Sequence, residues 1–143
     1  MRGVFKHIPH LLAIVILAML LSGCAGSCNE VKARLGEEFS LRIGQTASIT
    51  KENLEIRFAE VVEDSRCPRN VICVWAGRVS CIVQLTNSDS CYKMVLTEPG
   101  LAEQYAKETY KDYQFAFHVE PYPEAGRNIA EKEYRLLLVI GKR

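Results

Sequence analysis

The cysteines are the residues of this sequence whose type and spacing have the most direct chemical consequences. Cys67 and Cys73 enclose the segment Pro-Arg-Asn-Val-Ile, and no histidine stands near them to complete a zinc site. Their spacing predicts a disulfide that closes a loop of seven residues. The chain-entropy model gives such a crosslink a stabilisation of about 2–2.5 kcal/mol.

Cys81 and Cys91 form the candidate second disulfide, across a hairpin turn predicted at residues 86–90. A turn centred near Ser88 sets Cys81 opposite a residue near position 95, so this pair needs a bulge or a longer loop. Cys28 is a further candidate partner for either cysteine. The sequence leaves the pairing of these three cysteines open.

Acid–base catalysis finds little support among the titratable residues. Hydrolytic sites need a base that titrates near neutral pH beside a nucleophile or a metal, and histidine is the natural candidate. His7 and His10 lie in the N-terminal segment, which leaves His118, on the strand face opposite its aromatic neighbours. The sequence has no glycine-rich phosphate loop, nucleophile elbow or histidine–cysteine metal cluster. We therefore expect no enzyme, no cofactor and no metal site, and we rank a hydrolase assembled from scattered residues last.

The predicted disulfide loop and its flanks carry the side chains best suited to binding. Arg66, Arg69 and Trp75 offer cationic and aromatic contacts of the kind that anchor interfaces. A loop closed by a disulfide loses little conformational entropy when it binds. Tyr122, in the turn Pro121-Tyr122-Pro123, is the fourth candidate binding residue.

Each of these candidates also has a structural interpretation. Trp75 lies on the same predicted strand face as the second cysteine of the loop, so we favour a ring packed against the disulfide or the core. Arg66, in a structural role, pairs with Asp64 or with Glu120. An exposed Trp75 would favour binding, whereas a cleft that gathers Asp64, Glu120 and His118 would favour catalysis.

The N-terminal segment has the composition of a targeting signal. Arg2 and Lys6 precede eleven uninterrupted apolar residues, 11–21, a run shorter than the roughly 20 residues that a transmembrane helix needs. Leu21-Ser22-Gly23-Cys24 then resembles a lipobox, whose cysteine is diacylated on sulfur after cleavage just before it. We predict a lipoprotein signal peptide at residues 1–23. We also predict lipidation of Cys24, with palmitate among the attached acyl groups. The alternative is an ordinary signal peptide whose cleavage site happens to precede a cysteine.

A lipidated Cys24 predicts a location at the cell envelope, on the extracytoplasmic side of a membrane, because two or more acyl chains suffice for stable attachment. Ala25 predicts the outer membrane if the source is Gram-negative. Removal of residues 1–23 from 143 leaves 120, enough for one domain. Loss of Arg2 and Lys6 lowers 18 basic residues to 16, against 17 acidic ones, so the formal net charge becomes −1. This balance gives no support to nucleic-acid binding.

Strand periodicity dominates the rest of the chain. Residues 24–36 are polar and predict a tether, and beyond them apolar and polar residues alternate. The alternating runs are 39–43, 46–50, 54–58, 92–96 and 113–119, joined by a β-branched run at 74–85 and an apolar run at 134–140 typical of a central strand. Only residues 101–109 have a helical pattern. We predict an all-β domain over residues 37–143, a single small β-sandwich or barrel of about six to eight mostly antiparallel strands.

Residues 64–77, with Asp-Ser-Arg-Cys-Pro at one end and Cys-Val-Trp-Ala-Gly at the other, resemble a segment of a family of small uncharacterised bacterial and archaeal secreted proteins and lipoproteins. In that family the segment links two strands. Pro121-Tyr122-Pro123 and Glu133-Tyr134-Arg135 fit the C-terminal part of the pattern, whereas Cys81 and Cys91 lie outside it. The resemblance covers roughly residues 38–143. It implies a compact β-domain and brings no activity with it.

These observations lead to a leading function hypothesis and two alternatives. We expect a lipid-anchored, non-catalytic β-domain that binds a protein partner or a cell-wall component at the envelope. The first alternative is a structural or stress-related envelope lipoprotein without a defined ligand, and the second is the hydrolase mentioned above. No motif in the sequence identifies the ligand.

Overall fold

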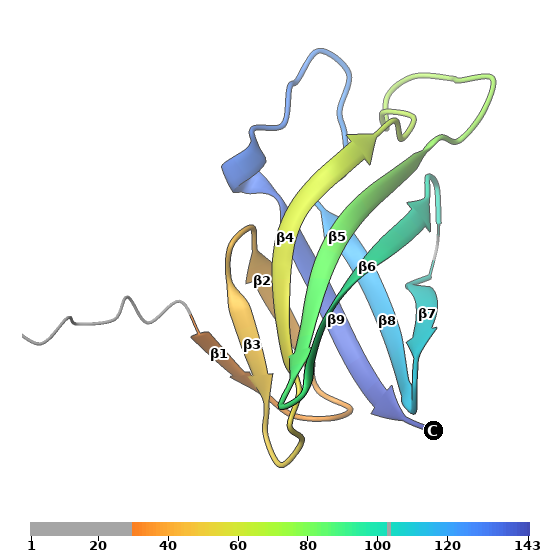
Figure 1. The fold of residues 1–143 in the computed structure, drawn as a ribbon. Coiled ribbons are helices and arrows are strands. Elements are labelled where there is room, and N and C mark those ends of the chain that lie inside the picture. Colours follow the sequence, from red (N-terminus) through yellow and green to blue (C-terminus); the bar gives the residue numbers. More distant parts are fainter. Residues whose placement is uncertain (1–29, 103) are drawn as a thin grey trace, which may run out of the picture.

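The computed structural model describes residues 30–102 and 104–143 and shows an all-β domain (Figure 1). Nine strands build two sheets, one of five strands and one of four. The prediction of a small, mostly antiparallel β-sandwich is confirmed, with one strand more than the predicted upper number. The barrel alternative is wrong for the described chain, because each sheet keeps its own edge strands.

The five-stranded sheet has the order β1-β3-β4-β5-β6. Its strands are β1 (Glu30–Ala33), β3 (Thr46–Ile49), β4 (Glu55–Asp64), β5 (Arg78–Asn87) and β6 (Ser90–Pro99). The four-stranded sheet has the order β2-β9-β8-β7. Its strands are β2 (Glu38–Arg42), β9 (Arg135–Lys142), β8 (Tyr113–Glu120) and β7 (Ala106–Tyr110). Among the described strand pairs only β1–β3 is parallel, and a short 3-10 turn, η1 (Glu131–Glu133), precedes β9.

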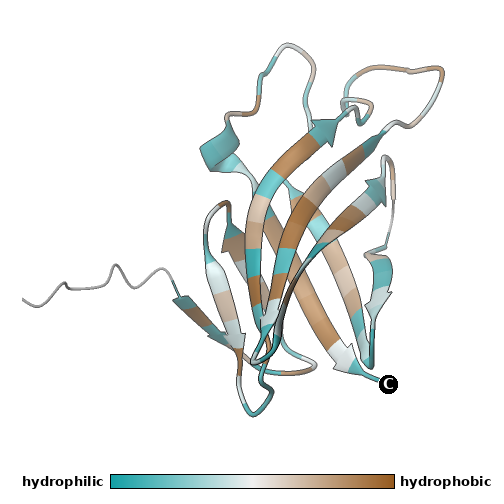
Figure 2. Cartoon of the chain, viewed as in Figure 1, coloured by the Kyte–Doolittle hydropathy of each residue, from teal (hydrophilic) through white to brown (hydrophobic). Residues whose placement is uncertain are grey.

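The core lies between the sheets and is built from one face of each long strand. Hydrophobic and hydrophilic residues alternate along these strands in Figure 2. Ile56 and Phe58 of β4 and Phe115 and Phe117 of β8 are at most 1% exposed, as the period of two predicts. Burial of these apolar side chains is the main favourable term in folding. β9 lies between β2 and β8, so the predicted central position of the last strand is confirmed.

Three segments differ from their predicted structure. β1 lies within the predicted tether and pairs with β3, so the β-domain has begun by Glu30 rather than at residue 37. Residues 106–110 form β7 instead of a helix, because pairing with β8 outweighs the local helical pattern. β5 begins only at Arg78, so residues 74–77 belong to a loop rather than to a strand.

The disulfide between Cys67 and Cys73 is confirmed, whereas the predicted pair of Cys81 and Cys91 is wrong: within residues 30–102 and 104–143 both are free thiols. The β5–β6 register sets Cys81 opposite Leu96, and Cys91 lies at the other end of the hairpin, opposite Thr86. No bulge interrupts this pairing to bring the two sulfurs together.

The predicted signal peptide, lipidated Cys24 and the tether residue Cys28 fall outside the described residues, so these assignments stay predictions. In the part of the chain that the structure describes, no helix is both long enough and apolar enough to cross a membrane.

Candidate functional site

Residues 67–76, which lie within the connection from β4 to β5, form the most distinctive surface feature of the sandwich, and we call them the stapled loop. Figure 1 shows this loop extending beyond the ends of β4 and β5, at the same end of the sandwich as the connection from β8 to β9. Its first residue, Cys67, is crosslinked to Cys73. The disulfide thus closes the first part of the loop on itself.

Close backbone packing fixes the base of the stapled loop. The N–H of Cys67 donates to the carbonyl of Ala76 at 2.8 Å, and the N–H of Gly100 donates to that of Gly77 at 2.9 Å. Gly77 has φ +69°, and a Cβ there would lie 1.8 Å from the carbonyl oxygen of Ser65. A Cβ on Gly100 would lie 2.0 Å from the carbonyl oxygen of Ala76. Only glycine allows these backbones to approach so closely.

The far side of the stapled loop exposes four large apolar residues, which we call the apolar tip: Val71, Ile72, Val74 and Trp75. Ile72 and Val74 are fully exposed and Trp75 is 81% exposed. The favoured prediction of a Trp75 ring packed against the core or the disulfide is therefore wrong. The reason is that β5 starts three residues later, so no strand directs the indole toward the core. Clustered exposed apolar side chains of this kind mark interaction sites.

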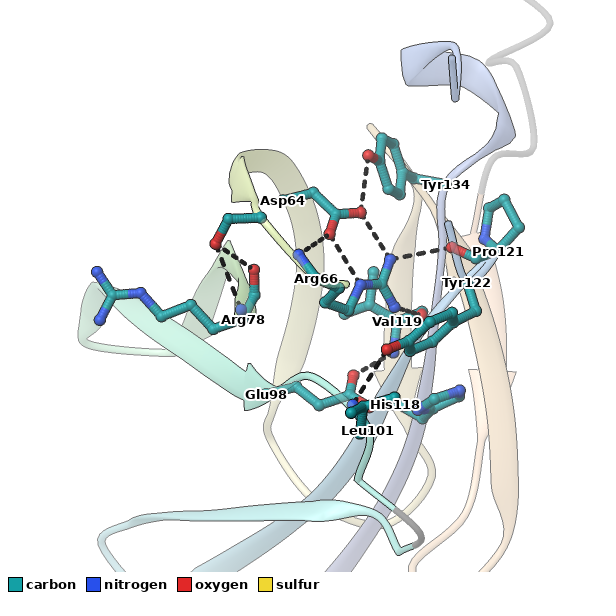
Figure 3. A network of polar contacts seen from close by, with 11 residues as sticks. Asp64, Arg66, Arg78, Glu98, Leu101, His118, Val119, Pro121, Tyr122 and Tyr134 are labelled. Atoms are coloured by element: carbon teal, nitrogen blue, oxygen red, sulfur yellow. Dashed lines mark hydrogen bonds and ion pairs between the residues drawn. The ribbon is translucent and has the colours of Figure 1, made fainter. Parts of the chain in front are cut away.

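Arg66 lies beneath the stapled loop and serves the fold. Its guanidinium is fully buried and forms a two-pronged ion pair with Asp64, with Nε–Oδ1 and Nη2–Oδ2 distances of 2.8 and 2.7 Å (Figure 3). It also donates to the carbonyls of Val119 at 2.7 Å and Pro121 at 2.9 Å. The structural pairing with Asp64 is confirmed, and burial leaves the guanidinium of Arg66 little exposed surface for the binding contact predicted for it. A buried guanidinium needs such an ion pair and hydrogen bonds, because burial removes the water that would otherwise solvate its charge.

The hydroxyl of Tyr134 donates to Asp64 Oδ2 at 3.1 Å, which ties the start of β9 to the same ion pair. Partial burial and the negative charge of Asp64 raise the pKa of Tyr134 to about 12. The end of β4, the end of β8 and the start of β9 are thus joined by a single polar network.

Tyr122 fastens the base of the stapled loop to the β8–β9 connection. The guanidinium of the buried Arg66 lies 5.0 Å from the centroid of the Tyr122 ring, and that of the exposed Arg69 lies 5.2 Å from it. The Tyr122 hydroxyl accepts a hydrogen bond from the N–H of Leu101 at 3.1 Å, and the N–H of Arg69 donates to the Pro123 carbonyl at 3.1 Å. Of the four candidate binding residues, Arg69 and Trp75 are exposed, Tyr122 is half-buried and Arg66 is buried.

His118 is on the outer face of β8, as predicted, and is held by Glu98 of β6, a residue that sequence analysis missed. The two side chains hydrogen-bond through His118 Nδ1, and the second carboxylate oxygen of Glu98 accepts from the N–H of Val119 at 2.8 Å. Glu98 is 1% exposed. The sequence could have indicated its burial, because Glu98 follows Met94 and Leu96 at every second position and so lies on the inward face of the strand. Among the described residues His118 forms no hydrogen bond with a serine, threonine or cysteine, so no activated nucleophile accompanies it.

A cleft of about 630 Å³, which we call the polar cleft, lies beside the stapled loop and contains Arg69, His118, Glu120 and Tyr122. Asp64 is not part of it, so the combination that would favour catalysis does not assemble. The other charged residues of the cleft come from β2, β9 and the segment before β9: Arg42, Glu124, Arg127, Lys132, Glu133 and Arg135. The described chain contains no group of three or more side chains placed to hold a metal ion.

Comparison with known proteins adds no relative: no protein-family model, curated protein or solved structure matches the chain. The resemblance based on residues 64–77 therefore stays a prediction, and the function must be argued from the site itself.

Proposed function

We propose that this protein is a lipid-anchored, non-catalytic binding domain of the cell envelope and that the apolar tip contacts a protein partner. The observation that carries the proposal is the exposure of Ile72, Val74 and Trp75, each at least 81%. Full burial of a large apolar side chain contributes about 1.5–3 kcal/mol. These three residues, one of which is an indole anchor, fit the small central cluster that dominates protein interfaces.

The construction of the stapled loop supports recognition. The disulfide and the glycine contacts at its base hold the loop before any partner arrives, so little entropy is lost on binding. Residues 67–76 contain no acidic side chain, and Arg69 is their only charged residue. The partner surface that fits is therefore an apolar pocket or groove with acidic groups at its rim.

The predicted tether favours a partner other than the bilayer that holds the lipid. Only residues 25–29 separate Cys24 from β1, and the six steps of chain from Cys24 to Glu30 span at most roughly 20 Å. Strand pairing places Glu30 beside Thr46 and Thr46 beside Arg57 of β4, so Glu30 and Arg57 lie at the same height of the sheet. From there to its end at Asp64, β4 advances along the sheet only as far as five residues of β5, roughly 17 Å, because two register shifts interrupt its pairing, and the stapled loop extends beyond that end. A sandwich standing with its apolar tip in that bilayer would therefore need the tether at its full length, a constraint that a partner outside the bilayer does not impose.

The experiment is site-specific photo-crosslinking in intact cells of the source organism, with the photoreactive residue placed at Val74. The matched control carries it at Val95 of β6, which is 57% exposed and lies outside the stapled loop. We expect one recurrent protein from position 74 and none from position 95. The purified partner should then bind the wild-type chain and lose affinity for Trp75→Ala.

Equal crosslinking from both positions, or equal affinity of wild type and Trp75→Ala, would contradict the binding proposal and favour the structural or stress-related alternative. The anchor is tested separately with Cys24→Ala, which should move the chain from the membrane fraction to the aqueous fraction. Retention of Cys24→Ala in the membrane would show that lipidation is not what holds the protein there.

A further inference from the structure

Most of the positively charged side chains of the polar cleft form no ion pair in the described chain. Of its five arginine and lysine residues, only Arg127 has an ion-pair partner, Glu133, at 2.9 Å. The remaining four have no carboxylate in ion-pair contact within the described residues: Arg42, Arg69, Lys132 and Arg135. Glu133 is further occupied by the N–H of Ala130. The cleft thus contains four cations without an ion pair and only two further carboxylates, those of Glu120 and Glu124.

Two of these cations are neighbours on adjacent strands. Arg42 of β2 and Arg135 of β9 are direct register partners, and both are exposed. Like charges directly opposite one another destabilise a sheet. Glu120, on the other side of Arg135, offsets part of this repulsion without forming an ion pair. Residues that oppose folding in this way are expected at functional sites.

Two further groups of the cleft are held in place by neighbouring residues. Arg69 is positioned through its backbone by Pro123 and through its guanidinium by the Tyr122 ring. His118 is oriented by the buried Glu98, which leaves Nε2 without a hydrogen-bond partner in the described chain (Figure 3). Groups that are fixed before a ligand arrives lose little entropy on binding it.

We propose that the polar cleft is a binding site for an oxyanion, a carboxylate or a phosphate, carried by a small polar ligand. Arginine supplies four of its five cationic side chains, and a guanidinium matches planar carboxylate and tetrahedral phosphate groups with two parallel hydrogen bonds. A volume of about 630 Å³ accommodates a ligand larger than the anion alone. This site contains no residue of the apolar tip and shares only Arg69 with the stapled loop.

The test is an NMR titration of the full mature chain carrying Cys24→Ala, at constant ionic strength set with chloride, because added salt alone screens surface charges. The probes are inorganic phosphate in one arm and malonate, a dicarboxylate, in the other. We expect saturable shifts of the backbone amides of residues 118–135, with Kd in the millimolar range. Arg42→Gln and Arg135→Gln should each weaken binding about tenfold. The matched control is Arg57→Gln, an exposed strand arginine of the other sheet, which should bind as the wild type does.

Saturation by phosphate, by malonate or by both supports the proposal and identifies the anion. No saturable shift with either probe, or an equal loss in Arg57→Gln, overturns it. Urea unfolding separates a ligand-binding role from a structural one. Removal of Arg42 or Arg135 should leave the urea midpoint unchanged or raise it, whereas a lower midpoint with intact anion binding also overturns the proposal. Trp75→Ala should leave phosphate and malonate binding unchanged, so failure of this site and failure of the apolar tip are distinguishable.

Discussion

At the residue scale, the site depends on how three buried polar groups are satisfied. Arg66, Asp64 and Glu98 lie within or next to the core, and each is hydrogen-bonded: Arg66 to Asp64 and to two carbonyls at the end of β8, Asp64 also to Tyr134, and Glu98 to His118 and the N–H of Val119. No buried side-chain nitrogen or oxygen of the described chain lacks a hydrogen bond. Because each partner compensates the burial of the other, removal of one member costs more than removal of both.

Arg66→Met should lower the free energy of unfolding by about 3–5 kcal/mol, because it leaves the carboxylate of Asp64 buried and unpaired. The double variant Asp64→Asn/Arg66→Met should be less destabilised than Arg66→Met alone. Urea unfolding followed by circular dichroism measures both. A double variant as unstable as the sum of the two single variants would show that the ion pair contributes no coupling.

The two free cysteines should differ sharply in reactivity. Burial raises the pKa of the Cys81 thiol to about 12, with a smaller contribution from the charge of Glu98. Cys91 is exposed. With the disulfide intact, iodoacetamide should modify Cys91 in the folded protein and Cys81 only after unfolding, as read by peptide mass spectrometry. Comparable labelling of Cys81 in the folded state would mean that its strand opens readily.

At the element scale, the stapled loop combines a tightly held base with an unsupported tip. Hydrogen bonds, the disulfide and two glycine contacts act on its base, whereas the apolar tip touches little of its own domain. Residues of the tip therefore contribute little to folding. Changes in the staple and changes in the tip should have different effects on stability.

Replacement of both Cys67 and Cys73 by serine should lower the free energy of unfolding by about 2–2.5 kcal/mol without changing the fold. Trp75→Ala should change it by no more than about 0.5 kcal/mol, because the indole is exposed. Urea unfolding of the two variants beside the wild type tests the contrast. A large loss of stability in Trp75→Ala would indicate that the ring packs on the domain in solution.

At the scale of the whole molecule, half-buried tyrosines link the two sheets and the loops around them. Tyr113 donates to Glu52 at 2.5 Å and Tyr105 donates to Glu38 at 2.6 Å, while Tyr134 joins β9 to the Arg66 network. The hydrogen bond to Glu52 raises the pKa of Tyr113 to about 12, and burial followed by the bond to Glu38 does the same for Tyr105. These tyrosines bind their protons more tightly in the folded state than in the unfolded state.

Stability should therefore fall under alkaline conditions. Below the unfolded pKa of 10.0 both states keep the phenolic protons, so the contribution of Tyr105, Tyr113 and Tyr134 is fully present. As the pH rises from about 10 toward 12 the unfolded state ionises first, and this contribution is lost. Urea midpoints measured across this window, with tyrosinate absorbance, test the prediction. Tyr134→Phe should show a shallower decline than the wild type, and an identical decline would contradict the role of Tyr134.

The sequence by itself determined the β-class, the inward faces of the long strands and the Cys67–Cys73 disulfide. Strand periodicity and a six-residue separation are local properties that the chain carries without reference to its partners. The pairing of Arg66 with Asp64 was within reach for the same reason, since the two residues are two positions apart.

Only the tertiary structure decided the rest of the site. Arg66 donates to carbonyls 53 and 55 positions away, His118 pairs with a glutamate 20 positions earlier, and Arg42 meets Arg135 through strand pairing. Trp75 is exposed because β5 begins after it, and the two free cysteines are apart because of the β5–β6 register. Such contacts depend on where strands begin and which strands pair, and those choices are set by packing of the whole core rather than by any short stretch of sequence.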